Sequence, residues 1–274
     1  MTKSGFANAL AGAKDDLLFF AFFASFADND FAETGFYRDT RPMSLLTQAE
    51  TVALALSFKI ALVGVFCSLP VAIGCAWLLA RKRFFGKPLF EGLLLLPLIL
   101  PPVVTGYILL IMFGHHGAIG RWLDAAGLSI AFRWTGAALA AAVMAFPLLV
   151  VALRNAFESV DRRLENAAAT LGAGAWRIFF SVTLPLSLRG LVAGLALAFA
   201  RAFGEFGATI TFVSSIPGQT RTLPIALYEL ISTPGGEGGA LRLALVAVIV
   251  ALLAGLIAAL MLLRGGERGA GAEA

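Results

Sequence analysis

Charged side chains are scarce in this 274-residue chain, and so are the side chains that build most metal sites and disulfides. Asp, Glu, Lys and Arg make up only 14% of the residues, against about 25% in an average soluble domain. The two cysteines, Cys67 and Cys75, lie in one apolar run and are interpreted as small hydrophobic side chains. The two histidines are adjacent and lack the further ligands that a metal needs. The low share of charged residues, together with the high apolar share of the chain, argues against a disordered chain, a coiled coil and an ordinary soluble enzyme.

Hydrophobic residues, in contrast, make up 59% of the chain, which favours an α-helical membrane protein that crosses the bilayer several times. A helix needs about 20 apolar residues to span the hydrocarbon core. Alternation with period two is absent, which argues against a barrel. We therefore predict an all-α, polytopic membrane protein with five transmembrane helices, at Val52–Leu79, Leu89–Phe113, Thr135–Leu153, Gly190–Val213 and Leu241–Leu263.

The distribution of Lys and Arg predicts the orientation of these spans. The segments after the first, third and fifth spans carry eleven basic residues, and the alternate segments carry four. Basic residues concentrate on the cytoplasmic side. We therefore expect the N-terminus outside, the C-terminus in the cytoplasm, and residues 266–274 as a cytoplasmic tail.

The first 42 residues fit this scheme poorly. Their one apolar run, Leu17–Ala27, has 11 residues, which is too short to span the membrane, and no basic cluster precedes it as in a signal peptide. Residues 1–42 are interpreted as an external tail or as a misassigned start before Met43. The transmembrane domain is then expected over residues 43–265.

Prolines gather in the second predicted span. Pro97, Pro101 and Pro102 interrupt it, and single prolines, Pro70 and Pro147, occur in the first and third spans. A proline removes a backbone N–H and bends a helix, and membrane helices tolerate this where neighbours satisfy the freed carbonyl. Ordinary packing kinks are one interpretation. The density of the cluster favours a functional bend that lines a path.

The polar segment between the third and fourth spans, residues 154–189, carries the clearest functional pattern. Asp161 is a plausible N-cap, and the alanine run that follows favours a short helix. Gly172 and Gly174 allow a tight reversal, and a second short helix limited by Pro185 is expected next. Such a segment could dock in a groove of a partner, or it could merely join two spans. Composition alone leaves both alternatives open.

The spacing of this segment resembles the EAA loop of bacterial ABC importer permeases: Glu-Ala-Ala, three residues, Gly, nine residues, an aliphatic residue, one residue, Leu-Pro. Val182 takes the place of the aliphatic residue. The chain departs from the pattern at its first position, where Asn166 replaces the glutamate and Glu165 lies one residue earlier. The resemblance implies that the segment couples the chain to an ATPase through Glu165, Asn166, Ala167, Ala168, Gly172, Leu184 and Pro185.

Further segments resemble the sulfate and molybdate branch of these permeases. Residues 198–210 and 96–104 match that branch, and residues 211–224 and 233–237 are closer to the molybdate permeases. The resemblance implies a type I permease-like bundle, a homodimeric pore in the bacterial inner membrane, and molybdate, tungstate or sulfate as cargo. It also implies two ATPase subunits that carry MgATP and an external binding protein. The chain itself is expected to bind no cofactor or metal, to contact membrane lipid, and to have no nucleic-acid partner.

Two charged residues fall inside the fourth predicted span. Arg201 and Glu205 lie four residues apart, on one helix face, and ionisable residues in a span usually face the bundle interior or water. Arg201 could add positive potential along an anion path while Glu205 holds it, or the pair could only fix helix packing. A packing role is favoured over direct contact with the cargo, because a closed ion pair leaves little net charge to bind an anion. Lys59, near the outer end of the first span, can snorkel.

The outer loops combine a few basic residues with several glycines, and we assign them to docking of the binding protein. Glycine-rich turns could also present N–H groups to an anion. The basic and histidine side chains of these loops are His115, His116, Arg121, Arg133 and Arg221.

Two other classes of protein compete with an importer subunit. A self-sufficient secondary transporter would be expected to show inverted repeats and coupling carboxylates within its spans, whereas Glu205 is the one clear acid away from the ends of the predicted spans. An intramembrane enzyme would need a catalytic motif, and no H-E-x-x-H, G-x-S-x-G or paired aspartates occur in the spans. The phosphate-binding motif G-x-x-x-x-G-K-[ST] is also absent, so ATP must be hydrolysed by a partner.

Overall fold

The computed structural model describes the backbone of residues 46–270 and the side chains of residues 46–263. Within that part of the chain every regular element is a helix. The predictions for residues 1–42 and for a start at Met43 lie outside the described residues, as do the last four residues of the predicted cytoplasmic tail.

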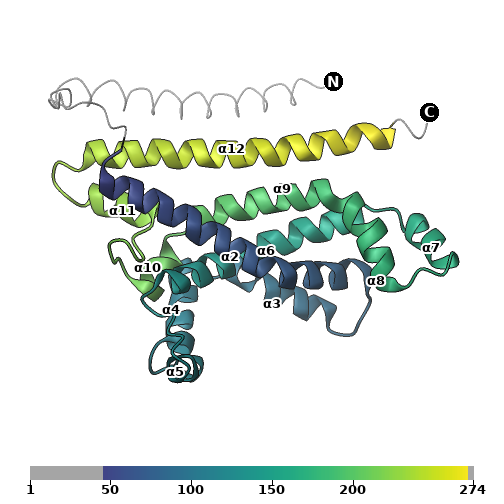
Figure 1. The fold of residues 1–274 in the computed structure, drawn as a ribbon, viewed down its shortest axis with the longest axis horizontal. Coiled ribbons are helices and arrows are strands. Elements are labelled where there is room, and N and C mark those ends of the chain that lie inside the picture. Colours follow the sequence, from purple (N-terminus) through teal and green to yellow (C-terminus); the bar gives the residue numbers. More distant parts are fainter. Residues whose placement is uncertain (1–45, 271–274) are drawn as a thin grey trace, which may run out of the picture. The chain divides into compact units, whose positions relative to one another are not determined.

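Four long helical segments run side by side and make the body of the molecule (Figure 1). α2 packs on α6, α6 on α9, and α9 on α12. Each segment is long and apolar enough to cross a membrane. The last helix continues past the predicted end of the fifth span and past residue 265. The four segments are α2 (Gln48–Arg81), α6 (Trp134–Glu158), the run that ends in α9 (Ala175–Phe203) and α12 (Glu237–Ala270).

The second predicted span is a broken one. It consists of α3 (Lys87–Ile99) and α4 (Pro102–Phe113), which are bent by 107° at the break. Two consecutive prolines supply no N–H, and a residue before proline is pushed out of the helical region; Leu100 accordingly has φ −69° and ψ 144°. Pro97 lies inside α3 and does not end it. The predicted bend is therefore present at Pro101 and Pro102, and the five predicted spans are present when α3 and α4 count as one.

The fourth predicted span is displaced toward the N-terminus. α9 (Leu184–Phe203) ends early, and a separate short helix, α10 (Gly207–Val213), follows the break. At its other end α9 is continuous with η1 (Phe179–Thr183) and α8 (Ala175–Ile178). The predicted stop at Pro185 was wrong.

The wider turn of η1 explains how the chain passes that proline. The η1 residues form a π-helical turn, in which the amide N–H of Leu184 bonds the carbonyl of Phe179, five residues back. Such local adjustments let membrane helices accommodate proline, because they provide other partners for the backbone groups that proline leaves unpaired. Pro185 then lies in the first turn of α9, where its missing N–H costs little.

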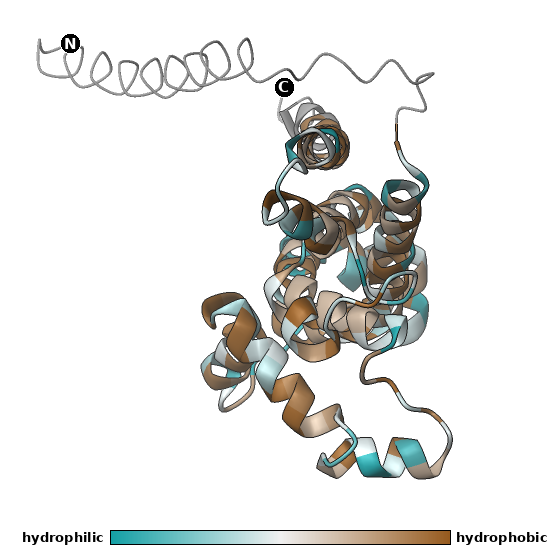
Figure 2. Ribbon diagram, turned by 90° about the vertical axis from the view of Figure 1, so that its left-hand side faces the viewer, coloured by the Kyte–Doolittle hydropathy of each residue, from teal (hydrophilic) through white to brown (hydrophobic). Residues whose placement is uncertain are grey.

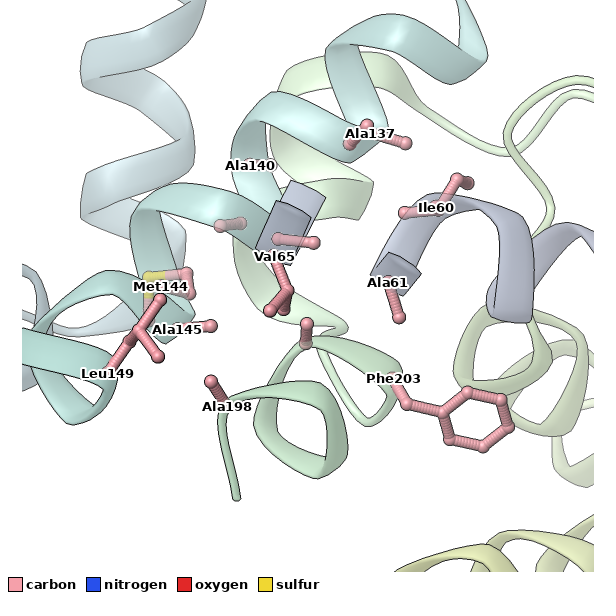
Figure 3. Close-up of a cluster of buried hydrophobic side chains, with 14 of the residues drawn as sticks. Ile60, Ala61, Val65, Ala137, Ala140, Met144, Ala145, Leu149, Ala198 and Phe203 are labelled. Carbon is pink, nitrogen blue, oxygen red and sulfur yellow. The ribbon is translucent and has the colours of Figure 1, made fainter. Parts of the chain in front are cut away.

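Small side chains fill the contact between α2, α6 and α9 (Figure 3). Ala61, Ala140 and Ala198 are fully buried there, one from each helix. A Cβ added at Gly64 of α2 would lie 2.8 Å from the carbonyl oxygen of Ala138 of α6. Lipid supplies no hydrophobic drive between helices, so close van der Waals packing of small residues holds them together. The core is correspondingly rich in alanine.

The short elements divide between the two ends of the bundle (Figure 1). α7 (Arg162–Thr170) and α8 lie at one end. α5 (Ala118–Ala125), α10 and α11 (Leu223–Ile231) lie toward the other end. The long helices consist mostly of hydrophobic residues (Figure 2). Many large apolar side chains are exposed on α3, α4 and α12, as expected of helices that face lipid or another protein.

Candidate coupling and translocation sites

Residues 154–189, the candidate coupling segment, contain the short helix that the sequence predicts. The carboxylate of Asp161 caps α7 by accepting a hydrogen bond from the amide of Arg163 at 2.8 Å. The helix ends at Thr170, and Gly172 adopts a left-handed conformation with φ +83°. That conformation suits glycine, because it has no Cβ to clash with the following carbonyl. The predicted N-cap and glycine turn are both present.

The carboxylate of Glu165 is held by hydrogen bonds from other residues of this chain. One carboxylate oxygen, Oε1, accepts hydrogen bonds from Nη2 of Arg81 at 2.8 Å and from Oγ1 of Thr183 at 2.6 Å. Nη2 of Arg81 also donates to the carbonyl of Val160 at 3.3 Å. The acid therefore ties together the end of α2, the helix α7 and the turn η1. Asn166, which stands in the motif position of the glutamate, is exposed.

Three large apolar side chains of the candidate coupling segment are exposed. Leu171, Trp176 and Phe180 are 88%, 78% and 60% exposed. The rings of Trp176 and Phe180 stack with their centres 6.2 Å apart and their planes at 19°. Among the other predicted residues of the segment, Ala167 and Pro185 are exposed, and Ala168 and Leu184 are half-buried. A cavity of about 820 Å³ opens beside this segment between α6 and α9.

The two helix breaks lie next to each other. α4 packs on α10, and a Cβ added at Gly207 would lie 2.8 Å from the Cβ of Pro102. A Cβ added at Gly106 would lie 2.8 Å from the Cα of Ala208. Glycines therefore let α4 approach the backbone of α10. The predicted candidates Pro101 and Pro102 are at this junction, whereas Pro97 lies one turn earlier, within α3.

Arg201 and Glu205 form the predicted ion pair, but at a break and not in the middle of a span. Arg201 is in the last turn of α9, and Glu205 lies between α9 and α10. The Glu205 side chain is 2% exposed, and its Oε1 accepts a hydrogen bond from the amide of Ala208 at 2.9 Å. The carboxylate thus joins the end of one helix to the start of the next.

Charged contacts also organise the end of the bundle that carries α11. Oε1 of Glu50, in the first turn of α2, lies 2.8 Å from Nη2 of Arg242 in α12. Arg221 Nε lies 2.9 Å from Oε2 of Glu229. The sequence interpretation missed the role of Glu50, although Thr47 and Glu50 have the spacing of a capping box and form one.

The remaining candidates of the outer loops do not converge on one site. His115 Nδ1 lies 2.7 Å from Asp124 Oδ2, and this hydrogen bond is the main reason that the pKa of Asp124 is lowered. His116 and Arg121 are exposed. Lys59 Nζ lies 3.7 Å from the centre of the Trp134 ring, a cation–π contact. Among residues 46–263, no group of three or more His, Cys, Asp or Glu side chains is placed to hold a metal ion.

Comparison with known proteins defines the class to which this fold belongs. Residues 68–265 match the family of binding-protein-dependent transport system inner membrane components. The chain belongs to that family, so it is a transport permease of the bacterial inner membrane with several membrane helices. The resemblance drawn from the EAA-like segment is confirmed at this level.

Curated relatives place the chain more narrowly. It is 56% identical to the molybdenum transport system permease protein ModB of Escherichia coli strain K12, over 78% of this chain and 93% of that protein. It is 56% identical to ModB of Haemophilus influenzae, over 74% and 90%. The sulfate transport system permease protein CysW of Synechocystis is 38% identical, over 73% and 74%.

Solved structures share the fold. A bacterial ABC transporter for import of the polysaccharide alginate matches with a TM-score of 0.60 at 14% identity, over 94% of this chain and 98% of that one. An amino acid ABC transporter matches with a TM-score of 0.51 at 16% identity, over 79% and 92%.

Proposed function

We propose that this chain is the permease subunit of an ATP-driven importer and forms the path for molybdate. The observation that carries this proposal is the 56% identity to a molybdenum permease over 93% of that protein's length. Tungstate and sulfate are related tetrahedral oxyanions, and a sulfate permease is also a relative, at 38% identity. They are the alternative cargoes.

The working transporter would be a homodimer of this chain with two ATPase subunits and an external binding protein. MgATP would bind to the ATPase subunits, as the phosphate-binding motif is absent from this sequence. The exposed side chains of Leu171, Trp176 and Phe180 support a protein partner on this segment, because exposed apolar side chains outside the membrane mark interaction sites.

The end of the bundle that carries α7 and α8 would face the cytoplasm. The excess of basic residues in the segments after the first, third and fifth predicted spans, eleven against four, supports this orientation. The N-terminus would then lie outside and the C-terminus inside. The contacts that join α2 to α12 and Arg221 to Glu229 would face the binding protein.

The paired breaks would line the translocation path. Non-helical backbone at membrane depth is tolerated where it is buried in protein or lines a water-filled cavity. The α3–α4 break at Pro101 and Pro102 lies against the start of α10, so the two breaks would border the same path. Arg201 and Glu205 would hold the second break in shape, since the carboxylate is already occupied by an arginine and an amide.

Uptake measurement tests this function. In a bacterial strain from which the native molybdate permease has been deleted, expression of this chain with its ATPase and binding protein should restore accumulation of labelled molybdate. Excess unlabelled sulfate should compete weakly. Equal competition by sulfate would assign the chain to sulfate, and uptake that does not depend on the ATPase subunit would contradict an ATP-driven importer.

A further inference from the structure

The loop between α2 and α3 exposes an aromatic side chain among basic ones. Phe85 makes almost no contact with the rest of the protein and is fully exposed. Its neighbour Phe84 packs edge-on against Phe90 of α3, with ring centres 6.0 Å apart. Phe84 therefore anchors the loop, whereas Phe85 is free to contact something outside the chain.

Two cations of this loop have no ionic partner among residues 46–263. Arg81 is paired with Glu165, and Lys87 donates to the carbonyl of Leu79 at 2.6 Å. The Nζ of Lys82, in contrast, lies over the Trp77 ring, 5.7 Å from its centre, and neither Lys82 nor Arg83 forms an ion pair with a described residue. The loop consequently presents two adjacent charges that can bind an anion.

The apolar surface of α3 continues from this loop. Leu89, Leu93 and Leu96 are 70%, 58% and 43% exposed, and they recur along the helix at spacings of four and three residues. Such spacing places them on one face. α3 has no buried residue. Since α3 is the first half of a membrane span, the exposed face begins at the level where headgroups meet hydrocarbon.

We propose that Lys82, Arg83 and Phe85 form a binding site for an anionic phospholipid. The two cations contact the headgroup phosphate, and Phe85 lies among the first methylene groups of the acyl chains. Basic residues directly after a membrane helix attract anionic lipids, and aromatic side chains favour this depth of the bilayer. A lipid fits better than a protein partner, because the apolar face that adjoins the site belongs to a spanning helix.

Native mass spectrometry of the purified permease in a neutral detergent tests the proposal. The protein is titrated with dioleoylphosphatidylglycerol or with dioleoylphosphatidylcholine, and bound lipids are counted. The wild type should retain phosphatidylglycerol preferentially. The Lys82→Gln, Arg83→Gln double variant should lose up to roughly 30-fold in apparent affinity, because each basic residue near a membrane surface contributes about fivefold. Phe85→Ser should weaken retention of both lipids.

Arg121→Gln is the matched control, because Arg121 is an exposed arginine on α5, toward the other end of the bundle. It should retain both lipids as the wild type does, and size-exclusion profiles show that each variant is folded. Equal retention of the two lipids by the wild type would overturn the proposal. So would a double variant that keeps phosphatidylglycerol but no longer co-purifies with the ATPase subunit, since the loop would then serve a protein partner.

Discussion

Arg81 and Glu165, 84 residues apart in the sequence, form a nearly buried ion pair at the base of the coupling segment. Nη2 of Arg81 lies 2.8 Å from Oε1 of Glu165, and the two side chains are 8% and 16% exposed. Thr183 donates to the same oxygen. The motif's alanines and glycine are thus held on the end of α2 by an acid that lies one position before the usual glutamate.

This geometry predicts that Glu165 stabilises the permease and that Asn166 does not. Glu165→Ala should lower the free energy of unfolding by about 3 kcal/mol, the lower end of the cost of breaking a buried pair. The substitution of Glu165 leaves the Arg81 guanidinium without its ionic partner. Thermal melting of the purified protein and recovery of the ATPase subunit both measure the effect.

Asn166→Ala is the control for that experiment, because Asn166 is the next residue and is exposed. It should melt as the wild type does. The opposite pattern, with Asn166→Ala losing the ATPase and Glu165→Ala unaffected, would show that the motif position itself makes the essential contact.

Gly172 and Gly174 allow a matched test of the turn. A Cβ meets nothing within 4 Å at either position, but Gly172 has φ +83° and Gly174 has φ −70°. Gly172→Val should therefore cost about 1–2 kcal/mol for a left-handed residue, and relief of that strain would displace α8. Recovery of the ATPase subunit and molybdate uptake should fall, whereas Gly174→Val should keep both. Equal effects of the two substitutions would exclude backbone conformation as the cause.

Local signals in the sequence predict the local parts of this site. Asp161 caps α7, and Gly172 makes the turn, because both effects depend on residues within one helical turn. The partner of Glu165 could not be predicted in the same way. Two arginines and two lysines follow the first span, and only the packed bundle brings Arg81 next to α7.

The breaks in the spans were harder to predict for a related reason. Hydropathy shows that Leu89–Phe113 and Gly190–Val213 are apolar, but it does not show where the chain turns. Pro101 and Pro102 indicate a bend, and its 107° angle depends on the packing of α4 against α10. The break at Glu205 has no proline. It depends on a buried carboxylate that pairs with Arg201 and accepts the Ala208 amide.

Gly106 provides a test of the contact between α4 and α10. An alanine Cβ there would lie 2.5 Å from the carbonyl oxygen of Ala208 and 2.9 Å from the Cβ of Thr211, and the backbone cannot move aside without moving α10. Gly106→Ala should cost about 1–3 kcal/mol, as overpacking of a tight contact does. Gly92→Ala in α3, where a Cβ meets nothing within 4 Å, should be neutral or stabilising. Folded yield on a size-exclusion column measures both, and a normal yield of Gly106→Ala would contradict the close approach.

Variants of Arg201 and Glu205 separate a packing role from a role in the anion path. Arg201→Met leaves a buried carboxylate without its ion-pair partner and should cost about 3 kcal/mol or more. Adding Glu205→Gln removes the charge but keeps an oxygen for the Ala208 amide, so the double variant should regain folded yield and melting temperature. Adding Glu205→Leu instead should regain less, because an unpaired buried N–H costs about 1–3 kcal/mol. If the Arg201→Met, Glu205→Gln double variant folds as the wild type does and still transports no molybdate, the Arg201–Glu205 pair acts on the anion directly. Its assignment to packing would then be wrong.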